Sequence, residues 1–484
     1  MIDYSKYEAV IGLEVHIQLL TASKAYSNDA ADYGAMPNTL VGVVSLGHPG
    51  TLPKVNKKVV EFAVKLGLAV DAQIRERNAY ARKNYFYADL PKGYQITQDT
   101  TPICTGGKIT IKLEDGSEKD IQITRIHMEE DAGKSIHDID PFHTLVDLNR
   151  AGVPLLEMVS EPDIRSSEEA YKYLTEVRKL VRYLDICDGN MEEGSMRCDA
   201  NVSVRIKGDK QFGRKVEVKN MNSIRNVQRA IEFEIRRQIE VLESGGEISQ
   251  DTRSFDSSNG TTFLLRSKEM ANDYRYFPEP DLPPVIVSKE FIQGIKINLP
   301  ELPHVLIKRY QQELGLGEYD ATNLTESRAF ASYFNLLIKD CSNYKGAANW
   351  MLGPVKSYLN ENGLSISQFS LSPGRLAALI HLVDQGKVSH TVAAQQLFPK
   401  LLTDTSLTPL HIAESLNLLQ DSSTENLMEF VKSAVAKYPE KVEEYKNGKV
   451  GLIGLFMGEV MKMSKGKADP KVANSMMKDY LDSI

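Results

Sequence analysis

The sequence is poor in cysteine and has no long apolar run. Its four cysteines form no Cys-x-x-Cys pair, so neither a structural zinc site nor a disulfide framework is indicated. No apolar stretch approaches the roughly 18 residues that a membrane-spanning helix needs. The N-terminal residues are acidic and lack the apolar core of a signal peptide. We therefore expect a cytoplasmic enzyme from a reducing compartment.

Several common catalytic motifs are also missing. The chain has no Gly-x-Ser-x-Gly elbow, no His-Glu-x-x-His pair and no Gly-x-Gly-x-x-Gly loop after a predicted strand. Residues 133–135 resemble the end of a Walker phosphate-binding loop, but Met128 stands where that loop requires a glycine. The formal net charge of −7 argues against coating nucleic acid as the main role, while a local basic patch remains compatible with it.

The composition is that of a globular protein, with 42% hydrophobic and 25% charged residues. A chain of 484 residues is expected to hold about three domains. The proline-rich segment 273–284 is interpreted as the exit from the first domain, because proline blocks helix interiors and central strands. Residues 299–303 then open a region of helical composition, and residues 404–409 form a polar linker.

The first predicted strand, residues 11–19, has two different faces. A period of two places Ile11, Leu13, Val15, Ile17 and Leu19 on one side and Glu14, His16 and Gln18 on the other. The polar side is either a solvated sheet surface or a functional one. A carboxylate and an imidazole two residues apart lie side by side on a strand, and both can ligate one cation.

Residues 123–163 concentrate acids and histidines between short apolar runs. Three consecutive acids begin at Glu129, two residues after His127, and Glu157 stands alone inside an apolar run. A buried carboxylate costs several kcal/mol unless a cation, a metal or several donors meet it. Glu157 is therefore a candidate functional residue, although an edge strand that lets it reach solvent or an arginine would also account for it.

Two further strands, at 197–205 and 215–219, alternate apolar residues with acids, bases and amides. A charged sheet face of this kind is either an ordinary solvent-exposed surface or the floor of a polar cleft. Its recurrence on three separate strands favours the cleft. Segment 81–98 sets two cations and four aromatic residues beside a Pro-Lys-Gly turn. That composition suits stacking on a base and charge on a phosphate, but it also occurs on ordinary strand surfaces.

Helical spacing is clearest at 55–68, 171–184, 232–242 and 373–385. Proline and glycine at the ends of the last segment occupy the positions that begin and end a helix. Two more helices are predicted, from 449 to 464 and from Asp469 onward. Five lysines gather around the turn between them: Lys449, Lys462, Lys465, Lys467 and Lys471. They either contact a phosphate backbone or complement a helix dipole.

The candidate ligands are hard oxygen donors with a histidine, and no cysteine accompanies them. Such a set suits magnesium better than zinc. Magnesium in an acid-lined cleft that also holds arginines and lysines is typical of phosphoryl transfer. The acids alone would equally serve a metal-dependent phosphoester hydrolase.

Eight segments of the chain resemble the family of B subunits of the aspartyl/glutamyl-tRNA amidotransferases. They are residues 11–16 (IGLEVH), 82–87 (RKNYFY), 127–134 (HMEEDAGK), 147–152 (DLNRAG), 159–163 (VSEPD), 192–195 (EEGS), 197–201 (RCDAN) and 273–281 (DYRYFPEPD). The resemblance extends to the C-terminal helices and implies an α+β fold. The domains that it implies are a mixed-sheet catalytic cradle at 1–293, an all-helical connector at 294–408 and a small helical tRNA-binding tail at 409–484.

The resemblance also implies a reaction. The B subunit of this family uses ATP and Mg²⁺ to phosphorylate the side-chain carboxylate of glutamate or aspartate misacylated on tRNA(Gln) or tRNA(Asn). Ammonia, released from glutamine by the amidase A subunit, then displaces the phosphate, and a small C subunit completes the heterotrimer. A subunit that only docks tRNA is the alternative. The sequence leaves open which of the two aminoacyl-tRNAs is the substrate.

Site residues follow from the same resemblance. The expected magnesium ligands are Glu14, His16, Glu129 and Glu157, with Glu130 as the alternative to Glu129. The candidates for contact with phosphate or with the aminoacyl end are Arg150, Arg197, Lys219 and Arg275. The candidates for ATP binding are Arg82, Lys83, Tyr85 and Lys134. The lysine-rich turn near the C-terminus is expected to contact tRNA.

One departure from the family concerns zinc. Many members carry a cysteine-ligated zinc in the segment that matches residues 26–47. This chain has Ser27, Asp29, Gly42 and Ser45 at the corresponding positions. We therefore expect no zinc, and a loop that is held by other contacts.

Overall fold

The computed structural model describes residues 2–267, 274–420, 424–464, 468 and 470–484. The chain divides into two compact units, Met1–Leu302 and Pro303–Ile484. The first is built on a mixed sheet with helices and the second on helices, so the predicted α+β class is confirmed. Among the helices of the described residues, none combines the length and the apolar composition that a bilayer span requires.

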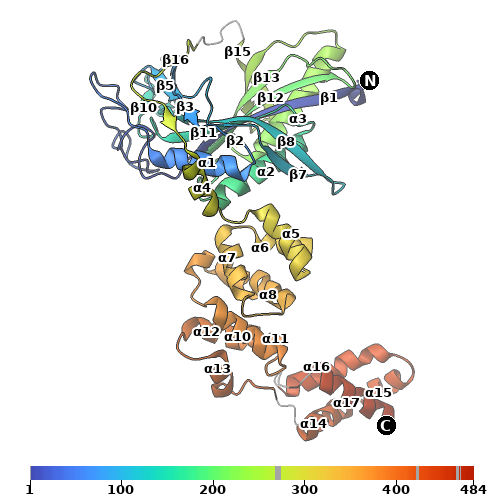
Figure 1. The fold of residues 1–484 in the computed structure, drawn as a ribbon. Coiled ribbons are helices and arrows are strands. Elements are labelled where there is room, and N and C mark those ends of the chain that lie inside the picture. Colours follow the sequence, from blue (N-terminus) through green and yellow to red (C-terminus); the bar gives the residue numbers. More distant parts are fainter. Residues whose placement is uncertain (1, 268–273, 421–423, 465–467, 469) are drawn as a thin grey trace. The chain divides into compact units, whose positions relative to one another are not determined.

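A large sheet forms the centre of the first unit (Figure 1). Its strands are β1 (Tyr7–Gln18), β2 (Gln73–Ile74), β6 (Cys104–Thr105), β7 (Lys108–Lys112), β8 (Glu118–Glu130), β11 (Pro154–Ser160), β12 (Met196–Ile206), β13 (Val216–Met221), β14 (Asp251–Asp256) and β15 (Thr261–Ser267). They run in the order β15-β14-β13-β12-β1-β11-β8-β6-β2, with β7 also paired to β8. Neighbours are antiparallel except for β13 and β14, which are parallel.

Three small sheets accompany the large one within the described residues. Strand β3 (Arg77–Asn78) pairs with β17 (Val285–Ile286), β4 (Ala81–Asn84) lies between β5 (Tyr94–Thr97) and β16 (Phe277–Pro278), and β9 (Lys134–Ile136) pairs with β10 (Leu145–Asp147). The interpretation of residues 273–284 as a domain exit is wrong. Pro278 lies in the edge strand β16, where a missing N–H is tolerated, and the chain then pairs with β3 through β17 before the unit ends at Leu302.

Helices cover one face of the large sheet (Figure 1). They are α1 (Lys57–Ala69), α2 (Ser167–Tyr183) and α3 (Ile224–Glu243), and α4 (Lys289–Ile297) packs on α1. A short 3-10 turn, η1 (Tyr4–Lys6), precedes β1. The helix predictions at 55–68, 171–184 and 232–242 are confirmed, but α3 begins eight residues early because Ser223 caps it by accepting from the Asn226 N–H. The apolar face of β1 lies in the core under these helices, as predicted.

The second unit is helical throughout the described residues. Its helices are α5 (Pro303–Leu314), α6 (Glu318–Leu324), α7 (Arg328–Leu337), α8 (Tyr344–Trp350), α9 (Lys356–Glu361), α10 (Pro373–Asp384), α11 (His390–Val392), α12 (Phe398–Thr403), α13 (Pro409–Ser415), α14 (Thr424–Ala436), α15 (Pro439–Lys446), α16 (Ile453–Met463) and α17 (Pro470–Ser483). Short 3-10 or π segments are η3 (Met351–Val355), η4 (Ile366–Gln368), η5 (Ala393–Leu397) and η6 (Val450–Leu452). Helices α10, α16 and α17 confirm the predictions for 373–385 and for the C-terminal pair.

One carboxylate in the loop between β1 and α1 accepts three hydrogen bonds. The Oδ2 atom of Asp29 accepts from the Ser27 hydroxyl at 2.9 Å, the Gly42 N–H at 2.9 Å and the Ser45 hydroxyl at 3.1 Å. A Cβ on Gly42 would lie 2.3 Å from Asp29 Oδ1, so the backbone can approach this carboxylate only at glycine. Hydrogen bonds to Asp29 therefore join the two parts of the loop, and further bonds tie Asn38 and Leu40 to residues 146–149.

Replacing Asp29 by alanine is expected to loosen this loop. Three donors lose their shared acceptor, which should lower stability by about 1–3 kcal/mol. Hydrogen exchange read by mass spectrometry over residues 22–53 measures the effect. Tryptophan fluorescence would not report on this loop, because the only tryptophan, Trp350, lies in the second unit. Asp32→Ala is the matched control, since Asp32 is an exposed acid of the same loop. Equal exchange in Asp29→Ala and the unchanged protein would contradict the role given to Asp29.

Candidate active site

Strand register brings polar side chains together on the sheet face that the helices leave open. His16 of β1 lies opposite Glu157 of β11, and Glu157 lies opposite His127 of β8. On the other side of β1, Arg197 of β12 lies opposite His16. These four residues form one row across four strands. Because alternate residues of a strand share a face, Glu129 of β8 stands beside this row.

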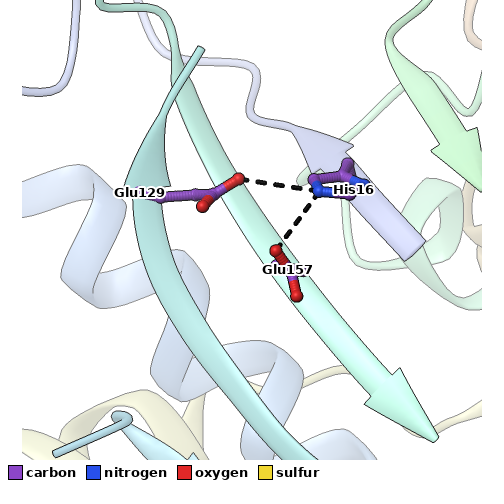
Figure 2. Close-up of side chains that lie close together, drawn as sticks. All are labelled: His16, Glu129 and Glu157. Atoms are coloured by element: carbon purple, nitrogen blue, oxygen red, sulfur yellow. Dashed lines mark ion pairs between the residues drawn. The ribbon is translucent and has the colours of Figure 1, made fainter. Parts of the chain in front are cut away.

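His16, Glu129 and Glu157, which we name the first acid group, offer ligand atoms within 4.8 Å of one another. Figure 2 shows the three side chains converging from β1, β8 and β11. His16 Nε2 lies 3.2 Å from Glu157 Oε2 and 3.8 Å from Glu129 Oε1. His127 is buried beside the group, with Nε2 3.6 Å from an oxygen of each carboxylate.

Burial and neighbouring charges have opposite effects on the pKa values of His16 and Glu157. Burial alone would lower the pKa of His16, but its hydrogen bond to Glu157 and the charges of Glu157, Glu129 and Asp199 raise it to about 9. Burial would likewise raise the pKa of Glu157. The hydrogen bond from His16 and the charges of His127, His16 and Lys83 instead hold that pKa well below its usual range. Glu157 is therefore ionised and His16 is protonated at neutral pH.

The residues of this group fit a hard divalent cation. Two carboxylates and one imidazole are oxygen-rich donors of the kind that Mg²⁺ and Mn²⁺ accept. The atom Nδ1 of His127 is buried without a hydrogen-bond partner in the described part of the chain. This unpartnered atom belongs to the imidazole whose Nε2 approaches both carboxylates, and an unsatisfied buried polar atom fits a site that takes a polar guest. The proton on His16 must leave before its Nε2 can act as a ligand.

Glu14, Asp199 and Glu217 form a second acid group within the described residues, again with ligand atoms within 4.8 Å of one another. Glu14 Oε1 accepts from the Asn201 amide at 2.8 Å. The Lys219 ammonium bonds to Asp199 and lies 2.9 Å from Glu217 Oε1. Burial, followed by the charges of Glu157 and Asp199, raises the pKa of Glu14.

The expectation that Glu14 shares one ion with His16, Glu129 and Glu157 needs correction. Glu14 stands two residues along β1 and faces Asp199 of β12 in register, so its oxygens fall in the second acid group. All four residues nevertheless line one cavity of about 250 Å³, which we name the acid cavity. Glu14 is therefore a neighbour of the first acid group and does not belong to it.

A second cavity of about 300 Å³, the tyrosine cavity, adjoins the acid cavity, and both are lined by His16, Lys83, Glu129 and Lys219. Its wall also includes Tyr85 and Arg197, so four of the predicted cation and aromatic candidates lie here. Asp131 raises the pKa of the Arg197 guanidinium and accepts a hydrogen bond from it at 2.9 Å. Burial would lower the pKa of Lys83, but Glu129 and neighbouring tyrosines raise it. Both side chains therefore stay cationic.

Glu130 and Arg82 lie away from the first acid group. Adjacent residues of a strand point to opposite faces, so Glu130 turns from Glu129 to an ion pair with Lys92 and accepts from the Ile96 N–H at 2.9 Å. Arg82 bonds both oxygens of Glu279, at 2.7 and 2.8 Å. Glu130 is thus not an alternative to Glu129 as a ligand. Arg82 links β4 to Glu279, the residue that follows the edge strand β16.

Three other predicted site residues line neither cavity. Arg150 donates to the carbonyl oxygens of Ala132 and Gly133 at 2.9 and 2.7 Å, which fixes the loop after β8. Lys134 is exposed on β9, in a separate small sheet. Arg275 is exposed, and its carbonyl oxygen accepts from Asn84 at 2.8 Å. Their positions follow from loops and edge strands, whose course the sequence pattern does not predict.

The predicted tRNA contacts are only partly described. Lys462 is exposed on α16, and Lys449 lies 3.0 Å from Glu444. Lys471 belongs to α17, and Lys465 and Lys467 lie outside the described residues. Lys462 makes no ion pair with any residue that the structure describes, which leaves its charge available for an anionic partner.

His127, Asp199 and Glu217 line the acid cavity and were not among the predicted site residues. Each had a signal in the sequence. His127 stands two residues before Glu129, on the same face of its strand, and Asp199 and Glu217 belong to the charged faces of alternating strands. What the sequence could not supply is the pairing of those strands with β1.

Comparison with known proteins adds a family. A family model described as the GatB/GatE catalytic domain matches residues 9–293, and one described as the GatB domain matches residues 332–481. The chain is similar to proteins named as the B subunit of aspartyl/glutamyl-tRNA(Asn/Gln) amidotransferase. Those of Chlorobium phaeobacteroides, Thermodesulfovibrio yellowstonii and Geobacter sulfurreducens are 48%, 49% and 49% identical to it. The alignments cover 98%, 98% and 97% of this chain and 99%, 98% and 98% of the relatives.

Cation binding at the first acid group is expected to depend on pH through His16. Its pKa in the cation-free protein is about 9, and the imidazole must lose that proton to become a ligand. Affinity for Mg²⁺ or Mn²⁺ should therefore rise with pH until about 9, by up to about tenfold per unit, and then level off. Calorimetric titration in buffers of different ionisation enthalpy measures the proton release. Binding that releases no proton would exclude His16 as a ligand.

Proposed function

Because the chain belongs to the family of B subunits of the aspartyl/glutamyl-tRNA(Asn/Gln) amidotransferases, we propose that its cleft activates a carboxylate with ATP. The enzymes of this family are ligases that form a carbon–nitrogen bond with glutamine as the amide donor. In the proposed reaction the γ-phosphoryl group passes to the side-chain carboxylate of aspartate or glutamate esterified to tRNA. Ammonia then attacks the acyl phosphate, the amide forms and phosphate leaves.

The observation that carries this proposal is the first acid group beside a cavity lined with cations. His16, Glu129 and Glu157 would hold Mg²⁺, and their donor set fits it. When bound, the ion would neutralise charge on the phosphates of ATP. The acids of this group would repel the carboxylate of the substrate unless positive charge stood between them.

The cations of the cleft can pair with the negative charges of the proposed substrate, its side-chain carboxylate and the phosphoryl group. Arg197 is oriented by its bond to Asp131, and Lys83 is held in the wall shared by both cavities. A planar guanidinium pairs well with a carboxylate or a phosphate. We assign Arg197 and Lys83 to binding the side-chain carboxylate and to stabilising the charge that develops on the transferred phosphoryl group.

The source of ammonia is assigned to another subunit. All four cysteines are buried and free, and burial raises the pKa of each thiol. Protonated thiols away from solvent are poor nucleophiles, so none is a candidate for glutamine hydrolysis. This supports partners of the kind expected from the sequence, an amidase subunit and a small third subunit.

The domain division is also a proposal. Residues 1–293 would form the catalytic cradle, 294–408 the helical connector and 409–484 the tRNA-binding tail. The matches of two family models, to 9–293 and to 332–481, are compatible with a catalytic part followed by helical parts. In the tail, exposed Lys462 is the best described candidate for a phosphate contact.

Glu129→Gln and Glu157→Gln are expected to abolish activation without abolishing glutamine hydrolysis. Loss of an outer-shell partner alone typically costs 10–100-fold, so tRNA-dependent ADP release by the assembled enzyme should fall about 100-fold or more. Thermal unfolding checks the fold, and Glu76→Gln, an exposed acid, is the control. Full amidation by folded variants would instead indicate a subunit that only docks tRNA. Cleavage of a simple phosphodiester, with no ADP release on misacylated tRNA, would indicate a hydrolase.

Lys462→Ala is expected to weaken tRNA binding and to lower its salt dependence. Removal of one phosphate contact should reduce the slope of log affinity against log salt by about 1. Filter binding of tRNA to the assembled enzyme at several salt concentrations measures both quantities. Lys437→Ala is the control, because the Lys437 ammonium already pairs with Glu459 at 2.8 Å. Identical slopes for the unchanged enzyme and Lys462→Ala would assign Lys462 to the helix dipole alone.

A further inference from the structure

Residues 274–281, which include β16, lie along β4, and we name this segment the strap. At one end the Asn84 N–H donates to the Tyr274 carbonyl oxygen at 3.0 Å. At the other end the Glu279 N–H donates to the Tyr80 carbonyl oxygen at 2.9 Å. Between these two bonds β16 pairs with β4. Most of the strap is exposed, so its position is set by its bonds to β4 more than by burial in the core.

An ion pair on one face of β4 fixes the strap. Arg82 donates to both oxygens of Glu279, at 2.7 and 2.8 Å, and to Asp281 at 2.9 Å. The Glu279 side chain is fully buried, and the Tyr94 ring centroid lies 4.1 Å from the guanidinium carbon of Arg82. A two-point bond between a planar guanidinium and a carboxylate sets direction as well as distance. The strap therefore has one preferred position on β4.

Lys83 lies on the other face of β4. Adjacent residues of a strand point to opposite faces, so Lys83 reaches the acid cavity and the tyrosine cavity while Arg82 meets the acids of the strap. The Nζ atom of Lys83 lies 4.6 Å from the centroid of the Tyr274 ring. An ammonium within about 6 Å of a ring face is attracted to it. Lys83 makes no ion pair or hydrogen bond with any residue that the structure describes, so the ring is the contact that orients its charge.

The backbone of the strap is strained between its two tyrosines. Arg275 has a φ of 42°, a left-handed conformation that a side chain of this size seldom adopts. The Asn84 amide supports this conformation, since it donates to the carbonyl oxygens of Tyr274 and Arg275 at 2.9 and 2.8 Å. Tyr274 and Tyr276 both line the acid cavity. Strain that persists beside a cavity wall indicates that the placement of the wall residues matters for function.

We propose that Tyr274 is a positioning residue for Lys83. Its ring keeps the Lys83 ammonium in the wall shared by the two cavities, and the bond of Arg82 to Glu279 keeps the ring in place from the opposite face of β4. The inference rests on the proposed ATP-dependent activation, in which Lys83 pairs with the side-chain carboxylate and the transferred phosphoryl group. A lysine has a long flexible stem, and a side chain that is already restrained loses less entropy when it binds. Tyr274 therefore acts on the reaction through Lys83, and its hydroxyl is not required.

Two substitutions of Tyr274 test the role of the ring. Tyr274→Leu removes the aromatic face and should lower the kcat for tRNA-dependent ADP release by the assembled enzyme by roughly 3- to 30-fold, the range that a cation–π contact spans. Tyr274→Phe keeps the face and should retain most of the rate. Glutamine hydrolysis should not change in either variant, and thermal unfolding checks the fold. Tyr33→Leu, at an exposed tyrosine that lines neither cavity, is the matched control.

A double-mutant cycle with Lys83→Met separates positioning from a loss of packing. If the ring acts through the ammonium, Tyr274→Leu should lower the rate little further in an enzyme that already lacks the ammonium. A loss of packing would contribute the same factor in both backgrounds. Glu279→Gln breaks the ion pair on the opposite face of β4 and should lower the rate in the same direction as Tyr274→Leu. Asp281→Asn is its control, because Asp281 is the more exposed partner of Arg82.

The outcomes separate this inference from the function on which it rests. If the unchanged enzyme releases no ADP on misacylated tRNA, the proposed function itself fails. If it does and Tyr274→Leu keeps the full rate, the inference fails alone. A rate for Tyr274→Phe as low as that for Tyr274→Leu would assign the effect to the hydroxyl, and independent effects of Tyr274→Leu and Lys83→Met would assign it to packing. Either result overturns the proposal. Full activity of folded Glu279→Gln would overturn the part given to the ion pair. Because Tyr274 is only half-buried, its variants decide the matter even if Glu279→Gln does not fold.

Discussion

The contact on which the candidate active site depends is that of a buried carboxylate with two imidazoles, one on each side. Glu157 lies 3.2 Å from His16 and 3.6 Å from His127, in a single row across three strands. Burial opposes the charge of this carboxylate, but the hydrogen bond from His16 and the charges of His127, His16 and Lys83 hold its pKa well below the usual range. A slip of one residue in any of the three strands would turn one of these side chains into the helix-covered core. The register of these three strands is therefore favoured by the charge pairing, and the charge pairing requires that register.

The two acid groups are balanced by cations that belong to the chain. The proton on His16 offsets negative charge in the first acid group, and the Lys219 ammonium does so in the second. A cleft balanced in this way can fold before any metal or nucleotide enters. In the proposed reaction an incoming divalent ion would replace the His16 proton. The same arrangement explains why so many carboxylates can gather on one sheet face without external charge.

Several charged residues near the cleft maintain its walls and do not line it. Arg82 ties β4 to Glu279, and Arg150 holds the carbonyl oxygens of the loop after β8. Glu130 is engaged with Lys92. Loss of such residues would disturb the site through its geometry, although none touches the first acid group. The division between lining and supporting charges follows from strand alternation, which sends neighbours such as Glu129 and Glu130 to opposite sides.

The sequence by itself determined the polar and apolar faces of the strands, most helices and the resemblance to a family. It also showed that burying the Glu157 carboxylate costs free energy. It did so because alternation, capping and burial cost are local properties. Only the tertiary structure decided that Glu129 rather than Glu130 joins His16, that Glu14 belongs with Asp199, and that His127 completes the row. Those outcomes depend on which strands pair and in what register, and the pairing of β1 with β11 and β12 joins residues more than a hundred positions apart. Periodicity within one strand carries no information about the partner that lies across from it.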